Sequence, residues 1–274
     1  MSEPTGPNKP RFTPPPGACD GHFHVFGPGH ASSGKTTDDL FALHRRLGFE
    51  RGVFVLTTKR GPENPQLLEV MAKSGGRYRG VALVDDSFDE RELKAMHDCG
   101  VRGVRFTFVP HLGGWPDPDM VRRVVKRIEP LRWHVTMLID PADLIRILDL
   151  VHAIPLPVVI DHMGRVKAGD GVAQPGFQAL LALVRRDNRW VKISGADRIT
   201  SAGKPFYDAV PYAQALIAAA PDRVFWGTDW PHPNNTYDID DAELVDLLPL
   251  YAPDALTQRR ILVDNPSRLY GFAA

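Results

Sequence analysis

Eight short apolar runs, each followed by a stretch of helical periodicity, constrain the fold of this chain more than any other feature. The runs lie at 18–25, 51–56, 79–84, 103–108, 134–139, 156–160, 190–194 and 223–227. Each has the length and composition of a buried strand. Helices are predicted at 38–48, 64–74, 88–99, 117–130, 141–152, 175–186 and 205–220, with further helix after 240. Strands that alternate with helices pair in parallel through right-handed crossovers, so the pattern predicts an α/β fold, a (β/α)8 TIM barrel.

Residues that favour helix ends flank several predicted helices. The predicted N-caps are Asp38, Asn64, Asp89 and Asp117, and the glycines predicted at helix ends are Gly48, Gly75 and Gly100. A doubly wound open sheet is the alternative architecture. That fold normally carries a glycine-rich phosphate turn after its first strand, and the segment Asp20-Gly-His-Phe-His24 does not match it.

The length of 274 residues suits one barrel domain. Residues 1–16 are polar and rich in proline, which predicts a flexible N-terminal arm, and residues 17–274 are assigned to the barrel. The sequence leaves open whether the protein is a monomer or a homo-oligomer.

Charge and cysteine content exclude several classes of partner. The 33 basic and 33 acidic residues balance, so no net field attracts nucleic acid or an anionic membrane. No apolar stretch approaches the roughly 20 residues that cross a bilayer. Cys19 and Cys99 are too few for a disulfide framework, and the N-terminus does not resemble a secretory signal. A cytoplasmic protein is the expectation.

Four polar side chains are predicted at the carboxyl ends of strands, where barrel sites gather. The two-residue period of a strand directs His22 and His24 to the same side. His162 follows the sixth predicted strand, and Asp229 follows the eighth. A lone Asp in this position is usually a cap or a turn residue, but two alternate imidazoles are costly to bury without partners. The sequence therefore predicts one shared site.

Three arginines form a second group. Arg105 interrupts the apolar fourth strand, Arg165 follows the sixth strand, and Arg198 follows the seventh. A guanidinium within a strand must be paired or face a wet cavity. Because arginine binds carboxylates through forked hydrogen bonds, these residues predict a small anionic, carboxylated substrate.

Three motifs together resemble one branch of a known superfamily. They are the segment Lys9 to Pro28 with its Asp20-Gly-His-Phe-His24 core, Asp161-His-Met-Gly-Arg165, and Trp226-Gly-Thr-Asp-Trp-Pro-His-Pro-Asn234. The chain resembles the 2-pyrone-4,6-dicarboxylate lactonase branch of the amidohydrolase superfamily, and the likeness extends through Asn265-Pro-Ser-Arg-Leu-Tyr270.

The resemblance implies a hydrolase that opens a carboxylated lactone in the catabolism of aromatic compounds. It implies that Asp229 is the general base that activates water, and that His22, His24 and His162 surround the lactone carbonyl. Arg105, Arg165 and Arg198 match arginines that bind the substrate carboxylates in that branch. These roles agree with the chemistry of a carboxylate base and preorganised donors.

The resemblance also implies that no metal is required. His22, His24, His162 and Asp229 are acceptable ligands for a divalent metal such as zinc, which keeps a metal-dependent site open. Arg105 stands where many relatives in the superfamily place a bridging Lys or Glu. A pocket rich in cations would also oppose a bound dication.

Several positions depart from the pattern of the lactonase branch. Thr57, Lys59 and Arg60 follow the second strand where that branch has a Cys-His pair, His111 replaces an arginine, and Leu138 replaces a tyrosine. Thr57, Lys59, Arg60 and His111 are therefore predicted to bind the substrate in a different geometry. His232 is predicted either to reach the substrate or to shape the loop beneath Asp229.

Three functions are consistent with the sequence. The first is a metal-independent hydrolase of a carboxylated lactone. The second is a metal-dependent decarboxylase or hydrolase of the same superfamily that acts on another small organic acid. The third is a barrel that binds small organic anions without catalysis, and Asp229 argues against it because binding alone needs no base.

Overall fold

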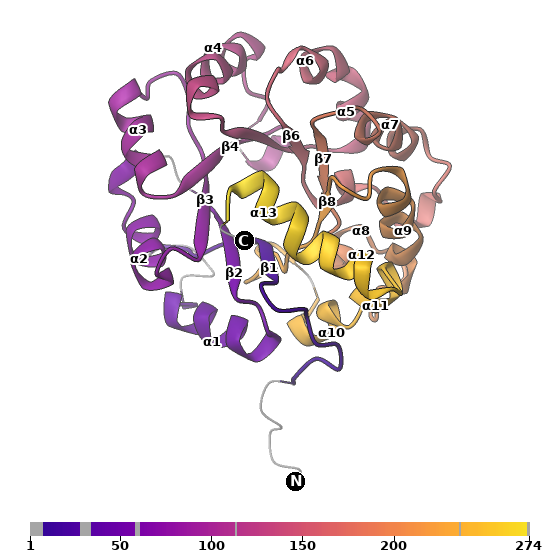
Figure 1. Cartoon of the computed structure of the whole chain (residues 1–274). Coiled ribbons are helices and arrows are strands. Elements are labelled where there is room, and N and C mark those ends of the chain that lie inside the picture. The colour runs from indigo at the N-terminus through magenta and orange to yellow at the C-terminus, as the bar shows by residue number, and fades with distance from the viewer. Residues whose placement is uncertain (1–7, 28–33, 58–60, 113, 236, 273–274) are drawn as a thin grey trace.

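Eight parallel strands pair in chain order, from β1 to β8, and surround one axis (Figure 1). The computed structural model describes residues 8–27, 34–57, 61–112, 114–235 and 237–272. The strands are β1 Cys19–Phe23, β2 Arg51–Val55, β3 Tyr78–Ala82, β4 Val101–Thr107, β5 His134–Leu138, β6 Val158–Ile160, β7 Arg189–Lys192 and β8 Val224–Phe225. The eight predicted strands and the predicted barrel are therefore confirmed; seven strands are shorter than the apolar runs, and β4 is one residue longer than its run.

Backbone hydrogen bonds between β1 and the chain after β8 close the barrel. The amide of Gly21 donates to the carbonyl of Trp226 at 2.9 Å, and the amide of His24 donates to the carbonyl of Trp230 at 2.7 Å. Gly227 allows this approach, since a Cβ atom there would lie 2.5 Å from the backbone nitrogen of His22. The glycine before Thr228 is thus required by the contact that brings the two ends of the barrel together.

Helices surround the strands on the outside of the barrel (Figure 1). They are α1 Thr37–Leu47, α2 Pro65–Ser74, α3 Glu90–Asp98, α4 Pro118–Ile128, α5 Pro141–Arg146, α6 Leu148–Ala153, α7 Pro175–Val184, α8 Ala196–Ile199, α9 Val210–Ala219, α10 Asp241–Val245, α11 Leu248–Tyr251, α12 Ala255–Arg259 and α13 Asn265–Tyr270. The helix predicted at 141–152 is divided into α5 and α6, and the helix predicted at 205–220 begins only at 207 with one turn of 3-10 helix. None of the described helices has the combination of length and apolarity that a membrane crossing requires.

Most of the predicted caps are confirmed, and one is wrong. Asn64, Asp89 and Asp117 accept hydrogen bonds as N-caps, whereas α1 is capped by Thr36 in place of Asp38. Thr36 accepts from the amide of Asp39, and the Asp39 carboxylate accepts from the amide of Thr36. This reciprocal pair satisfies two amides, which Asp38 inside the first turn cannot do.

The predicted glycine ends agree in part. Gly48 and Gly75 adopt the left-handed conformation that ends α1 and α2. Gly100 follows Cys99, which is the C-cap of α3. The described half of the predicted N-terminal arm lies on the barrel surface, where the backbone amides of Arg11 and Phe12 donate to Asp246. This half of the arm is held on the barrel.

An irregularity in β1 decides which of its side chains enter the barrel. The pairing of β1 with β2 shifts register between Asp20 and Phe23. Cys19 packs inside the barrel, but Phe23 packs in the core between the barrel and the helices, although a regular strand would place both on one face. After the register shift, the side chains that alternate with Phe23 face the interior of the barrel. His22 and His24 therefore point inward.

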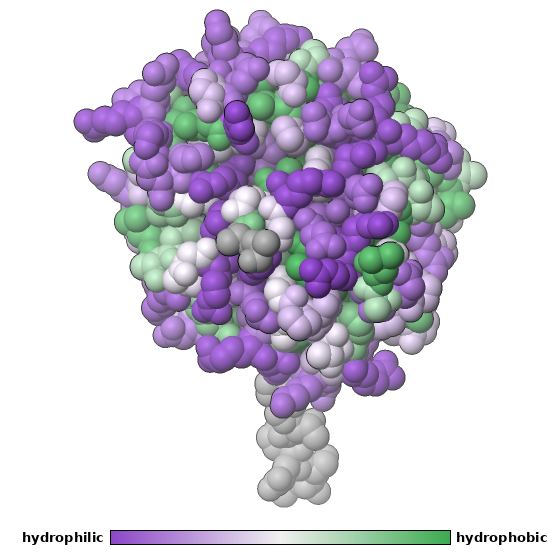
Figure 2. Space-filling view, in the orientation of Figure 1, coloured by the Kyte–Doolittle hydropathy of each residue, from purple (hydrophilic) through white to green (hydrophobic). Residues whose placement is uncertain are grey.

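The C-terminal helices close the amino-terminal end of the barrel. Helices α12 and α13 cross this end in Figure 1, and Figure 2 shows a mostly hydrophilic surface there. Tyr270 and Phe272 pack with Cys19 and other interior residues. With this end closed, the opposite end is the one open to a ligand.

His134 at the start of β5 predicts a pH dependence of stability. The ring is buried against Tyr270, and burial, with Lys192 contributing, lowers the pKa of His134 to about 3. Below about pH 6.5 the His134 ring is protonated in the unfolded chain but not in the folded chain, so the free energy of unfolding decreases as the pH is lowered. We expect His134→Leu to remove about 1.4 kcal/mol per pH unit from that slope below pH 6.

Urea unfolding of both proteins at pH 7, 6 and 5 measures the two slopes. The comparison of slopes is insensitive to any packing change that the smaller leucine causes. Equal slopes for the two proteins would show that His134 binds its proton as readily in the folded chain as in the unfolded chain, and would contradict the prediction.

Candidate active site

A cavity of about 330 Å³ opens at the carboxyl ends of the strands. Seven of the predicted site residues line it: His24, Thr57, Arg105, His162, Arg165, Arg198 and Asp229. The other lining residues are Val25, Phe26, Gly27, Phe54, Leu56, Asn64, Gln66, Leu83, Thr107, Leu112, Leu138, Pro233 and Asn234. The cavity therefore combines a charged floor with apolar walls, as small-molecule sites commonly do.

The two histidines of the first strand lie in contact. Nε2 of His22 lies 3.2 Å from Nε2 of His24, and the rings meet edge to face. Nδ1 of His24 lies 2.8 Å from the carbonyl oxygen of Val55. His22 is fully buried behind the cavity wall, and burial followed by the charge of Lys192 lowers its pKa well below the ordinary value. His22 is therefore neutral at pH 7.

Asp229 is held in a left-handed backbone conformation, with φ of 64°. Its amide donates to the carbonyl of His22 at 2.7 Å. The preceding residue, Thr228, donates through its amide and hydroxyl to the two oxygens of Asp20 at 2.9 and 2.6 Å. Because a non-glycine residue rarely adopts this conformation, these bonds hold the backbone of Asp229 where its side chain faces the histidines.

The two carboxylate oxygens of Asp229 have different surroundings. Oδ2 accepts hydrogen bonds from Arg198. Oδ1 lies 3.5 Å from Nε2 of His22, 3.3 Å from Nε2 of His24 and 3.8 Å from Nε2 of His162. Burial alone would raise the pKa of Asp229, but Arg198 and the imidazoles hold it well below the ordinary value. The carboxylate is ionised at neutral pH, and Oδ1 is the oxygen left for a reacting molecule.

A tight turn after β6 places His162 and Arg165 on the same cavity. Residues His162–Arg165 form a 3-10 turn, η4, in which His162, Met163 and Arg165 all have φ near 50°. Nδ1 of His162 lies 2.9 Å from the hydroxyl of Ser194. Burial lowers the pKa of His162 to about 3, so this imidazole is neutral as well.

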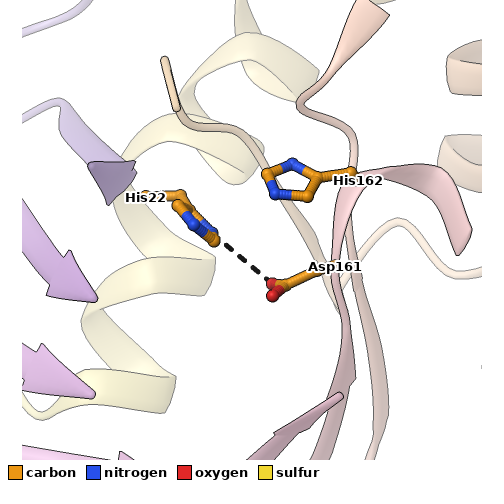
Figure 3. A group of neighbouring side chains, drawn as sticks. All are labelled: His22, Asp161 and His162. Atoms are coloured by element: carbon orange, nitrogen blue, oxygen red, sulfur yellow. Dashed lines mark ion pairs between the residues drawn. The ribbon is translucent and has the colours of Figure 1, made fainter. Parts of the chain in front are cut away.

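Asp161 links the histidines to a buried lysine and to Arg105. Figure 3 shows its carboxylate below His162 and directed toward His22, with Oδ1 at 3.5 Å from Nδ1 of His22. Nζ of Lys192 lies 3.0 Å from Oδ1, and Nε of Arg105 lies 2.9 Å from Oδ2. Burial would raise the pKa of Asp161, but Lys192 and Arg105 hold it well below the ordinary value.

Arg105 and Arg165 are anchored in the same way. Arg105 bonds Asp161 through Nε, and Arg165 bonds Asp140 through Nε at 2.6 Å. Within the described part of the chain, no hydrogen bond to another residue uses their terminal nitrogens. Both guanidinium groups therefore line the cavity with their forked ends unoccupied by any of the described protein groups.

The described charges around the cavity sum to a small excess of positive charge. Of the described charged side chains that line the cavity, Arg105, Arg165 and Arg198 are cationic and Asp229 is anionic. An anionic ligand would thus contact a wall on which cationic groups outnumber anionic ones.

Two predicted substrate residues are not on the cavity wall. His111 is exposed in the short 3-10 turn η2, Pro110–Leu112, where Leu112 faces the cavity in its place. Nε2 of His232 lies 3.0 Å from Asp241, and His232 is not among the residues that line the cavity. Lys59 and Arg60 lie outside the described residues.

Sequence reasoning missed three charged residues that organise the site. Asp161 and Lys192 pair inside the barrel, and Asp20 binds Thr228 beneath Asp229. The signal was present for Lys192 and was not used: a charge within an apolar strand must find a partner, as was argued for Arg105. Asp20 also accepts from Nε2 of His44 at 3.0 Å, so His44 is a buried packing residue.

The predicted metal ligands lie close together, but their present bonding does not suit a metal ion. Ligand atoms of His22, His24 and Asp229 all lie within 4.8 Å of one another, and His22 forms a second such group with Asp161 and His162. However, Arg198 bonds Asp229 and Lys192 contacts Nδ1 of His22 at 3.0 Å. Cations thus occupy the partners that a dication would need, and the donor set as arranged does not fit one.

Comparison with known proteins relates the whole chain to hydrolases of this architecture. The sequence model of the family described as Amidohydrolase matches residues 19–272. A 2-pyrone-4,6-dicarbaxylate hydrolase of Comamonas testosteroni is 42% identical, over 96% of this chain and 93% of that protein. A 4-sulfomuconolactone hydrolase of Hydrogenophaga intermedia is 39% identical, over 97% and 93%.

A solved structure agrees with this relationship. It is that of a candidate 2-pyrone-4,6-dicarboxylic acid hydrolase from Pseudomonas putida, with a TM-score of 0.82 and 31% identity. The match covers 94% of this chain and 98% of that one.

Proposed function

Because this chain belongs to the amidohydrolase family, we propose that it is a hydrolase that opens a lactone ring bearing acid groups, with Asp229 as the base. Two relatives that match nearly its whole length are named as hydrolases of a pyrone dicarboxylate and of a sulfomuconolactone. The natural reaction would belong to the breakdown of aromatic compounds.

One observation carries the proposal. Oδ1 of Asp229 faces three imidazole nitrogens at 3.3 to 3.8 Å on the wall of the cavity, while Arg198 engages Oδ2. An ionised carboxylate offers a proton acceptor, and the neighbouring neutral rings of His22 and His162 can donate to a developing oxyanion. A site that only binds anions would gain nothing from a carboxylate in this place.

The reaction follows from these positions. Water attacks the lactone carbonyl carbon and gives one proton to Oδ1 of Asp229, which produces a tetrahedral oxyanion beside the imidazoles. The ring C–O bond then breaks, and the departing ring oxygen takes the proton from Asp229. The products are a carboxylic acid and a hydroxyl group on one open chain; the acid releases its remaining proton to water at neutral pH, and Asp229 is ionised again.

The arginines determine the substrate class. Arg105 and Arg165 line the cavity and are anchored through Nε, so each can present two terminal nitrogens to a planar or tetrahedral acid group. The apolar wall formed by Phe54, Leu56 and Leu138 suits the face of an unsaturated ring. We assign a flat lactone that carries carboxylate or sulfonate groups as the substrate.

We propose further that no metal takes part. The bonds of Lys192 to His22 and of Arg198 to Asp229 support this, because they use groups that a metal would bind. A metal-dependent decarboxylase or hydrolase remains the competing function, and it requires the bond of Lys192 to His22 to be broken.

An assay of purified, metal-analysed protein tests the proposal. The panel contains 2-pyrone-4,6-dicarboxylate, 4-sulfomuconolactone and an uncharged 2-pyrone, each with and without a chelator. Hydrolysis of an acidic lactone that the chelator leaves unchanged is the expected result. Turnover that disappears with chelator would favour the metal-dependent function, and binding without turnover would favour an anion-binding protein.

Arg165→Met tests the assignment of the acid-binding arginines. Loss of a charge-assisted bond should raise KM for an acidic lactone about 10- to 100-fold and change kcat much less. Arg146→Met is the matched control, because Arg146 also pairs with a carboxylate, Asp143 at 3.0 Å, but does not line the cavity. Equal KM values for the two variants would contradict the role of Arg165.

A further inference from the structure

Lys192 lies beneath the cavity, and none of the reaction steps proposed above uses it. Its side chain is fully buried on β7. Nζ lies 3.0 Å from Oδ1 of Asp161 and 3.0 Å from Nδ1 of His22. An ammonium group donates protons and has no lone pair, so Nδ1 of His22 accepts this hydrogen bond. The proton of the neutral His22 ring is then on Nε2.

The orientation of the neighbouring ring leads to the same assignment independently. Nδ1 of His24 lies 2.8 Å from the carbonyl oxygen of Val55. A carbonyl oxygen only accepts, so His24 carries a proton on Nδ1, and in the neutral ring Nε2 has a lone pair. Since the two Nε2 atoms are 3.2 Å apart, His22 is the donor between the rings. Lys192, His22, His24 and Val55 thus form one hydrogen-bond chain that runs in a single direction.

The opposite tautomer of His22 has a poorer partner. A proton on Nδ1 would point toward Oδ1 of Asp161 at 3.5 Å, the contact drawn in Figure 3. That separation exceeds the usual range for an N–H···O bond. It would also bring a proton on Nδ1 against the ammonium of Lys192 at 3.0 Å. The geometry around Nδ1 therefore favours the Nε2-protonated ring.

We propose that Lys192 is a positioning residue that holds His22 in the Nε2-protonated tautomer, and that it thereby withholds from divalent metal ions the lone pair they would need on Nε2. This inference rests on the metal-independent function proposed above. The protonated Nε2 donates to Nε2 of His24 and lies 3.5 Å from Oδ1 of Asp229, so it is beside the place where an oxyanion would develop. Without Lys192, His22 can move its proton to Nδ1, and His22, His24 and Asp229 become a three-ligand zinc site.

The wild-type protein provides the first test. Long-range 15N–1H correlation spectra of protein labelled in its histidines distinguish the two neutral tautomers, and the spectrum of His22→Gln identifies the His22 signals. We expect the Nε2-protonated form for His22 and the Nδ1-protonated form for His24. An Nδ1-protonated His22 in the wild-type protein would overturn the inference. This measurement needs no Lys192 variant, so it holds even if such a variant does not fold.

Lys192→Met provides the second test. Metal-free protein is incubated with zinc and dialysed, and bound zinc is measured per chain together with the circular dichroism spectrum. We expect Lys192→Met to retain about one zinc per chain, and the wild-type protein and Lys192→Met/His22→Gln to retain almost none. Lys94→Met, which removes an exposed lysine paired with Asp98, is the matched control and should behave as wild type. Folded Lys192→Met that retains no zinc would contradict the inference.

The outcomes separate this inference from the proposed function. Loss of the His22 donor in Lys192→Met should lower the chelator-treated lactonase rate about 100-fold. If the wild-type protein hydrolyses no lactone, the function fails while the tautomer and zinc measurements still decide the role of Lys192. If the wild-type protein is an active lactonase with an Nδ1-protonated His22, the function stands and the role of Lys192 is rejected.

Discussion

Asp229→Asn should lower kcat for an acidic lactone about 100- to 10,000-fold, with a much smaller effect on KM. The amide keeps the size of the side chain and can still contact Arg198, but it cannot accept a proton from water. Steady-state kinetics on the best lactone of the panel measures the loss. In the wild-type protein this carboxylate is ionised well below neutral pH, so a modest change of pH around neutrality should not change its charge.

Asp241→Asn is the control for this experiment. Asp241 is also a buried carboxylate near the loop after β8, and it pairs with His232 at 3.0 Å, but it does not line the cavity. Its variant should keep the wild-type rate within about threefold, as expected when no reacting group is changed. Near-wild-type kcat in Asp229→Asn would remove Asp229 from the role of base, whatever its effect on stability.

Asp161→Asn should cost about 3 to 5 kcal/mol of unfolding free energy. Asp161 is fully buried and neutralises Lys192 at 3.0 Å and Arg105 at 2.9 Å. Its amide would leave a buried ammonium without a counter-charge, which is far more costly than loss of an exposed pair. Urea unfolding at pH 7 measures the change.

Asp38→Asn is the matched control for the buried pair. Asp38 also contacts a lysine, Lys73, at 2.9 Å, but both side chains are largely exposed. Water and salt screen such a pair, so no measurable change in stability is expected. If both variants were equally stable, burial of Lys192 and Asp161 would not have the energetic consequence assigned to it.

The barrel could be predicted because its signals are local. Eight apolar runs each separated by a helical stretch specify parallel pairing, and the polar residues that follow the runs then meet at one end. This reasoning predicts that His24, His162 and Asp229 share one site. In the structure, Nε2 of His24 and Nε2 of His162 lie within 3.8 Å of Oδ1 of Asp229. Errors arose where the choice was between close neighbours, as with the cap at Thr36 and the break between α5 and α6.

The charged partners of the site could not be read from the order of residues. Lys192 and His22 are 170 positions apart, and Asp20 and Thr228 are 208 apart. The residues around each of these positions do not indicate which buried polar groups form a pair. Likewise, the two-residue period of a strand predicts that His22 and His24 lie on one side. It does not predict that the irregularity in β1 turns this side toward the barrel interior.

By itself, the sequence determined the architecture, the end of the barrel that carries the site and the types of residue that meet there, because periodicity and strand ends are properties of short segments. Only the tertiary structure decided which oxygen of Asp229 is free, which proton His22 carries and which arginines keep their forked ends toward a ligand. Those properties depend on separations of about 3 Å between groups on different strands. Hydrogen-bond direction and the cost of burying charge change over such distances, and the folded barrel alone sets them.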